Sequence, residues 1–209
     1  MTSADPDNRR GPADLLAHLV SVATSPFIVS GITGVLLAIL LHATLAEALL
    51  WAAICVVFAA VIPFAVVYLL WRAGAVTDLH VAQRGQRVVP FAATLFSAAA
   101  GLVVLYLAQA PPQLLAVAAA FLGNGIPLTL ISLGWKVSAH TAVFTGCVLA
   151  LALVGPPAAL GGLGLVPVIL WARWYRQRHT IGQGLVPVLM TAAITPLVYG
   201  WVMGWLAKG

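Results

Sequence analysis

The residues best suited to chemistry are two histidines that stand beside cationic side chains in an otherwise apolar chain. His179 follows Arg173 by six positions in a polar segment at 171–183, and His140 closes a second polar segment at 135–140. Histidine can act as a nucleophile or a general acid, and an arginine fork matches phosphate oxygens. Two such histidines with nearby cations can cleave a phosphoester: one attacks phosphorus, the other protonates the leaving oxygen, and the cations stabilise the developing charge.

A third polar segment, at 78–87, contains His80, Arg84 and Arg87 and also Asp78. Carboxylates are otherwise scarce, and Asp78 is the one that can reach the polar segments. A protein-held magnesium ion usually needs several carboxylates. The sequence therefore predicts chemistry without a protein-bound metal or other cofactor.

The composition indicates an integral membrane protein. Apolar residues make up 62% of the 209 residues, charged residues only 7%, and the mean hydropathy is +1.06, whereas a soluble domain carries about 25% charged residues. We predict an all-α, polytopic membrane bundle of six or seven transmembrane helices, and no nucleic-acid partner. Residues 1–25 form a cytosolic or interfacial segment, and 26–209 form a single transmembrane domain. The predicted spans are 26–45, 48–71, 90–109, 113–133, 140–155, 157–174 and 184–206; with six spans, the first apolar run lies partly at the interface.

Counting spans places all three polar segments on the same face of the membrane. Spans three and four form one hairpin, and spans five and six form another, so the segments between them emerge together. With seven spans the N-terminus, which carries Arg9 and Arg10, shares that face. The positive-inside rule then predicts that the three segments face the cytoplasm, in the cell membrane.

The spacing of these residues resembles the type 2 phosphatidic acid phosphatase (PAP2) superfamily. Arg173 and His179, with five residues between them, match its third motif, and Ser138-Ala139-His140 resembles its second. The segment from His80 to Arg87 is similar to its first motif, Lys-x6-Arg-Pro, with the proline displaced to Pro90. The three motifs occur in the family's order and bracket nearly half of the chain.

The resemblance implies a PAP2-like fold and specific roles for the motif residues. His179 would be the nucleophile that accepts the phosphoryl group, His140 the general acid, and Gln183 the residue that orients His179. The residues implied in phosphate binding are His80, Arg84, Arg87, Lys136, Ser138 and Arg173.

The chain also departs from the family's motifs at several positions. The family's lysine is His80, the serine before the third-motif arginine is Ala172, and the proline and glycine of the second motif are Val137 and Ala139. The aspartate four residues after the nucleophile is Gln183. Glutamine can accept a hydrogen bond through its carbonyl oxygen and so fix the histidine tautomer, but it supplies no negative charge.

Two further polar residues have two interpretations each. Asp78 either supports the site or pairs with Arg84 or Arg87. Asn124, between Gly123 and Gly125, either allows close helix packing or faces the pocket.

We expect a phosphatase that hydrolyses a lipid phosphate or isoprenyl diphosphate through a phosphohistidine, with membrane lipids and an amphiphilic phosphorylated lipid or prenyl diphosphate as partners. One alternative is a PAP2-like enzyme that ionises or transfers a prenyl diphosphate, as a terpene cyclase or prenyltransferase does, with Mg2+. The other is a non-catalytic binder or transporter of lipid phosphates.

Overall fold

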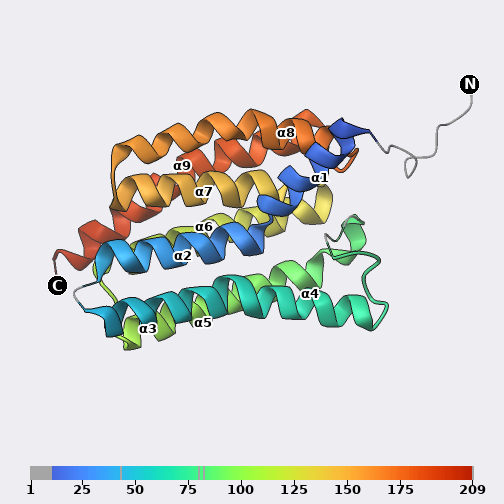
Figure 1. Ribbon diagram of the computed structural model, residues 1–209. Helices are drawn as coiled ribbons and strands as arrows, with labels where there is room; N and C mark the ends of the chain where they lie inside the picture. Colours follow the sequence, from blue (N-terminus) through green and yellow to red (C-terminus); the bar gives the residue numbers. More distant parts are fainter. Residues whose placement is uncertain (1–10, 43, 80, 82, 209) are drawn as a thin grey trace, which may run out of the picture.

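The computed structural model describes residues 11–42, 44–79, 81 and 83–208, except for the side chain of Arg84. This part of the chain is helical and contains no strand. The helices run roughly side by side, with the first helix and the C-terminus at opposite ends of the bundle (Figure 1). The elements are α1 (Pro12–Ala23), α2 (Pro26–Leu41), α3 (Leu45–Val56), the π-helical segment η2 (Val57–Val61), α4 (Ile62–Arg72), the 3-10 turn η3 (Arg84–Gln86), α5 (Val88–Leu107), α6 (Pro112–Gly134), α7 (Ala139–Val154), the 3-10 segment η4 (Pro157–Leu165), α8 (Val166–Tyr175) and α9 (Ile181–Leu206).

The described residues contain five helices long and apolar enough to cross a membrane, or six if α1 and α2, bent by 48° at their junction, count as one broken span. Continuous helix through η2 makes one span of Leu45–Arg72, and η4 with α8 makes another, Pro157–Tyr175. The prediction of an all-helical membrane protein is therefore confirmed. The fifth predicted span, 140–155, corresponds to α7, whose 16 residues extend about 24 Å, less than the ~30 Å hydrocarbon core.

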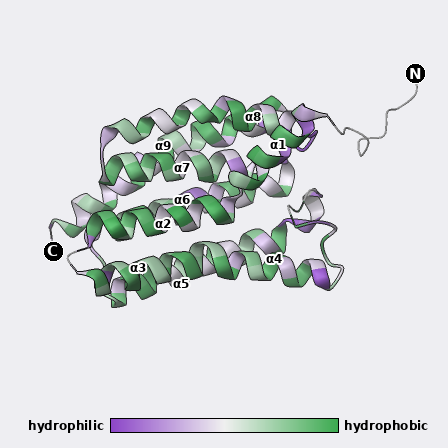
Figure 2. Ribbon diagram, viewed as in Figure 1, coloured by the Kyte–Doolittle hydropathy of each residue, from purple (hydrophilic) through white to green (hydrophobic). Residues whose placement is uncertain are grey.

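Helix packing joins segments that are distant in sequence. α6 packs along α9, α7 packs along both α2 and α9, and α1 lies against α8. An ion pair of 3.5 Å between Asp14 and Arg176 holds α1 at the end of α8. Figure 2 shows hydrophilic residues gathered at the end of the bundle that carries α1.

Pro63 explains the π-helical segment between α3 and α4. Proline has no backbone N–H, so it leaves helix carbonyls one turn earlier without a donor. Ser30 of α2 donates to the carbonyl of Ala59 at 2.9 Å, and Ser97 of α5 donates to the carbonyl of Phe58 at 2.6 Å. Two neighbouring helices thus satisfy the interrupted backbone.

Two glycines bring α2 close to the end of α3 and α5 close to η2. A Cβ at Gly34 would lie 2.5 Å from Cβ of Cys55, and one at Gly101 would lie 2.7 Å from Cβ of Phe58. These separations are shorter than carbon atoms tolerate, so both contacts require glycine. Beyond this contact α4 packs on α5 and η2, and it meets α2 through the edge-to-face rings of Phe27 and Phe64.

Candidate active site at one end of the bundle

Four of the residues predicted to act on phosphate line one cavity. Arg87 precedes α5, His140 is in the first turn of α7, Arg173 is in the last turn of α8, and His179 follows α8. All four border the same cavity of about 710 Å³, and each side chain is at most 6% exposed. The structure therefore brings Arg87 and Arg173, which are 86 positions apart in sequence, into one site, as the spacing predicted.

Backbone carbonyls hold the guanidinium of Arg87 in place. Its Nε donates to the carbonyl of Val81 at 3.0 Å, and its Nη1 donates to the carbonyl of Val137 at 2.8 Å. The guanidinium carbon also lies 5.9 Å from the centre of the Phe91 ring. Arg87 thus connects the first and second polar segments and is fixed before any ligand binds. The sequence offered no signal for these carbonyl acceptors.

A tight turn sets Arg173 and His179 close together. The backbone N–H groups of Arg178 and His179 both donate to the carbonyl of Arg173, at 3.0 and 3.3 Å, while Gln177 takes a positive φ of 51°. Nε of Arg173 and Nδ1 of His179 are buried and have no hydrogen-bond partner among the described residues. Buried polar atoms of this kind are costly unless a ligand or water satisfies them.

Hydrogen bonds to main-chain carbonyls at the start of α9 fix the position of His140 relative to His179. The N–H of Ser138 donates to the carbonyl of Gln183 at 2.9 Å, and the hydroxyl of Thr141 donates to the carbonyl of Gly184 at 2.9 Å. Ser138 is fully buried and caps α7, where its hydroxyl oxygen accepts from the N–H of Thr141. His140 therefore lies at a helix N-terminus, an end that favours anions.

The electrostatic field of the site is strongly positive. Burial, and then the charges of Arg173, Arg87 and Lys136, lower the pKa of His179 to about 2, while the Gln183 side chain acts weakly in the opposite direction. Burial, followed by the charge of Arg87, also lowers the pKa of Lys136. His179 is thus a neutral imidazole at ordinary pH, with a lone pair available for attack on phosphorus.

One described carboxylate acts on this cluster. Asp14 is paired with Arg176, and Glu47 belongs to the capping box at the start of α3. Asp78, which is partly buried, opposes the burial that lowers the pKa of Arg87. This effect is consistent with the interpretation in which Asp78 supports the site. Taken together, the described residues leave the cluster with excess positive charge, as an anion site requires.

Gln183 has a contact beyond the one expected. Its Oε1 accepts the backbone N–H of Thr180 at 3.1 Å, and the hydroxyl of Thr180 accepts the N–H of Gln183 at 3.3 Å, which is a capping box at the start of α9. A hydrogen bond with the Gln183 side chain also acts on His179, whose pKa it raises against the larger effect of burial, while Nδ1 of His179 has no partner among the described residues. Gln183 is thus shared between the helix cap and His179. The Thr-x-x-Gln spacing is a recognisable capping signal that sequence reasoning missed.

The remaining predicted residues are distributed around the cavity. Lys136 is partly buried, and its charge acts on His179. Asn124 lines the cavity and also donates to the hydroxyl of Thr195 at 2.9 Å, so both of its interpretations hold. His80 lies outside the described residues, and so does the side chain of Arg84.

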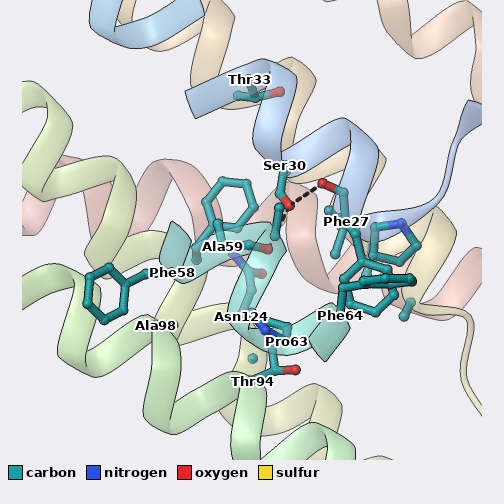
Figure 3. A pocket seen from close by; sticks show the side chains of 18 of the residues that line it. Phe27, Ser30, Thr33, Phe58, Ala59, Pro63, Phe64, Thr94, Ala98 and Asn124 are labelled. Carbon is teal, nitrogen blue, oxygen red and sulfur yellow. Dashed lines mark hydrogen bonds between the residues drawn. The ribbon is translucent and has the colours of Figure 1, made fainter. Parts of the chain in front are cut away.

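Beyond the cationic end, the cavity continues as an apolar chamber between α2, η2, α4, α5 and α6. Figure 3 shows part of this chamber, with Asn124, Pro63 and Thr94 among the residues that line it. The site thus combines a polar end suited to phosphate with an apolar interior suited to hydrocarbon.

The described residues contain no group of three or more His, Cys, Asp or Glu side chains that could hold a metal ion. Comparisons of the chain with protein-family models, curated proteins and solved structures find no match. Functional inference therefore rests on the residues and the geometry of this cavity.

Proposed function

We propose that the protein is a membrane-embedded phosphatase of lipid phosphates or isoprenyl diphosphates, and a divergent member of the PAP2 superfamily. The observation that carries the proposal is the shared cavity: two buried arginines and two buried histidines border one end of an apolar chamber. An amphiphilic phosphate has the complementary form, with an anionic head and a hydrocarbon tail. The order and spacing of the three motifs support the family assignment.

In the proposed reaction His179 attacks phosphorus. A bond forms between its ring nitrogen and phosphorus as the bond from phosphorus to the leaving oxygen breaks, and His140 gives that oxygen its proton. Water then cleaves the phosphohistidine, with His140 accepting the proton from the water. No metal ion takes part in these steps.

The other groups bind the phosphoryl oxygens. Arg87 is pre-positioned by its two carbonyl bonds, and the unsatisfied Nε of Arg173 is available to the anion. The N-terminus of α7 adds a favourable dipole, and Lys136 adds a further charge. These groups act where charge accumulates in the transition state.

A second reaction is supported by the contact of Gln183. Its oxygen accepts the N–H of Thr180, and an amide at this position supplies no negative charge to support a cationic His179. The same pocket would then serve as a clamp for a prenyl diphosphate that ionises or is transferred, with Mg2+ arriving on the substrate. A non-catalytic lipid-phosphate binder is the third candidate.

Product analysis separates these functions. Purified protein is incubated with phosphatidic acid and with prenyl diphosphates, with EDTA or with added Mg2+. We expect free phosphate that is insensitive to EDTA and lost in His179→Ala. A rearranged or transferred prenyl group that needs Mg2+ and survives His179→Ala would overturn the phosphatase, and unchanged lipid would indicate a binder.

A further inference from the structure

The cavity extends along the bundle well beyond the cationic site. Its lining runs from Pro90 to Leu105 on α5 and from Thr129 back to Leu114 on α6. Each of these stretches advances 15 residues, which at a helical rise of ~1.5 Å corresponds to about 22 Å. This length exceeds half of the ~30 Å hydrocarbon core, so the cavity reaches past the middle of the bundle.

Three hydroxyl groups in the wall bond to the protein's own backbone. The hydroxyls of Ser30, Thr94 and Thr129 each donate to a backbone carbonyl, at 2.8 to 2.9 Å. Their donors are therefore not directed at a ligand. Most of the remaining wall is hydrocarbon, including Phe58 and Phe121, so the wall suits a tail without polar groups.

The two ends of the chamber differ in how they are closed. At the far end Leu37, Leu105 and Leu114 are each at most 3% exposed and belong to one packed core cluster. Near the cationic site, the chamber is bordered by Phe27 of α2 and Phe64 of α4, whose rings pack edge to face with 5.6 Å between their centroids. The far end therefore forms a floor of packed core residues, whereas a ring contact between α2 and α4 borders the near end.

We propose that the far end of this cavity limits the length of the substrate's hydrocarbon tail, which makes the floor and the wall of α5 the determinants of substrate choice. The inference rests on the proposed function for the position of the phosphate. An extended chain advances about 1.2 Å per bond, as the peptide backbone does at ~3.3–3.6 Å per three bonds, so 22 Å holds about 18 bonds. This matches a tail of roughly four isoprene units, at about four chain bonds each, or an alkyl chain of similar length.

The limit on tail length appears as a sharp fall in binding affinity beyond a certain length, and not as an affinity that rises steadily with each added carbon. A tail in the bilayer is already in an apolar medium, so moving it into the cavity yields little hydrophobic free energy. Tails up to the limit bind alike. Longer tails must fold back or leave through the near end, which disturbs the packed wall.

A series of straight-chain alkyl phosphates of about 10 to 26 carbons tests the limit. Binding to the full-length protein in nanodiscs is measured by competition, and phosphate release is measured in parallel. We expect similar binding up to about 18 carbons and at least about tenfold weaker binding for the longest chains. Binding that shows no break up to the longest chain overturns the inference.

A matched pair of variants on α5 tests the wall. Ala98 lines the cavity eight residues beyond Pro90, about 12 Å along the helix, whereas Ala100 is exposed and is not part of the lining. Ala98→Leu is expected to move the break to about 10 carbons, and Ala100→Leu to leave it in place. An equal break in both variants contradicts the proposal.

A photolabel tests the same proposal in the unaltered protein. Hexadecyl phosphate with a diazirine at its last carbon should label peptides that contain Leu105 or Leu114. Labelling confined to outward-facing residues such as Leu130, which is 61% exposed, overturns the inference. A length break in binding without phosphate release would refute the phosphatase and retain the tail site, and release without a break would do the reverse.

Discussion

Replacing Arg173 by lysine tests whether its guanidinium binds the phosphate directly. The side chain is 4% exposed, and its Nε has no partner among the described residues. Lysine keeps the positive charge but loses the planar fork that engages two oxygens. The substitution therefore removes about one charge-assisted hydrogen bond, roughly 1.5–3 kcal/mol, and binding should weaken about tenfold to 150-fold.

A matched control for this substitution is available at Arg176, three residues further along the chain. Arg176→Lys makes the same chemical change at a position where the arginine pairs with Asp14 at 3.5 Å and is partly exposed. An ion pair of this kind contributes about 0–1 kcal/mol, and it lies outside the cavity lining. We expect its affinity for anions to stay within about twofold of the wild type.

Both variants are measured by calorimetric titration with dodecyl phosphate and, separately, with inorganic phosphate. The loss in Arg173→Lys should be similar for the two ligands, because the fork contacts the head and not the tail. Equal affinities for Arg173→Lys and Arg176→Lys would refute the assignment of Arg173 to the phosphate site. A loss seen only with the alkyl ligand would also refute it, since that would place Arg173 against the tail.

Five further predictions concern the chemistry, the framework and the orientation in the membrane. His179→Ala should abolish phosphate release, at least about a thousandfold by analogy with other activated nucleophiles, while dodecyl phosphate still binds by calorimetry; release above that level excludes the phosphohistidine. His140→Ala should slow alkyl phosphates more than p-nitrophenyl phosphate, whose leaving group needs little protonation; equal slowing in rapid-quench assays contradicts a general acid. Gln183→Asp should raise the pKa of His179 from its value of about 2, because a negative charge favours imidazolium, and hydrolysis should increase. The acidic limb of the pH–rate profile is set by protonation of His179, so it should move towards neutral pH. An unmoved limb would refute the link between residue 183 and His179. Arg87→Ala should lower the free energy of unfolding by about 2–5 kcal/mol, because two backbone carbonyls lose their donor; an unchanged denaturation midpoint would show that these bonds do not hold the loops. A cysteine placed at Gly85 should react with impermeant maleimide only from the cytoplasmic side, and labelling from outside alone would reverse the predicted orientation.

The helices could largely be predicted because hydropathy alone decides which segments enter a membrane. The span predicted at 184–206 corresponds to α9, and the one at 48–71 to α3 and α4 together. Both begin three residues earlier than predicted, at Ile181 and Leu45, because a capping box precedes each. Hydropathy does not detect such polar caps, although the spacing of the capping residues can be recognised in the sequence.

The apolar chamber could not be predicted, because it depends on pairs of helices that meet only in the fold. Pro63 signals an interrupted helix, but the sequence does not show that Ser30 and Ser97 supply the missing donors. The carbonyl of Val137 that holds Arg87 is equally invisible, since every residue has a carbonyl group. Motif spacing predicted which side chains gather, and left open how the backbone holds them.

The bonds that tie the start of α7 to the start of α9 also bear on how this site can change over evolutionary time. Ser138 and Thr141 donate to main-chain carbonyls at residues 183 and 184, and a carbonyl acceptor persists whichever side chain the residue carries. The side chain at residue 183 can therefore be exchanged during divergence without removing the acceptor that holds the two histidine-bearing segments together. Homologous proteins that have diverged at the surrounding positions can keep the same distance in space between His140 and His179. A structural search based on that distance would detect such relatives even where sequence similarity is no longer detectable.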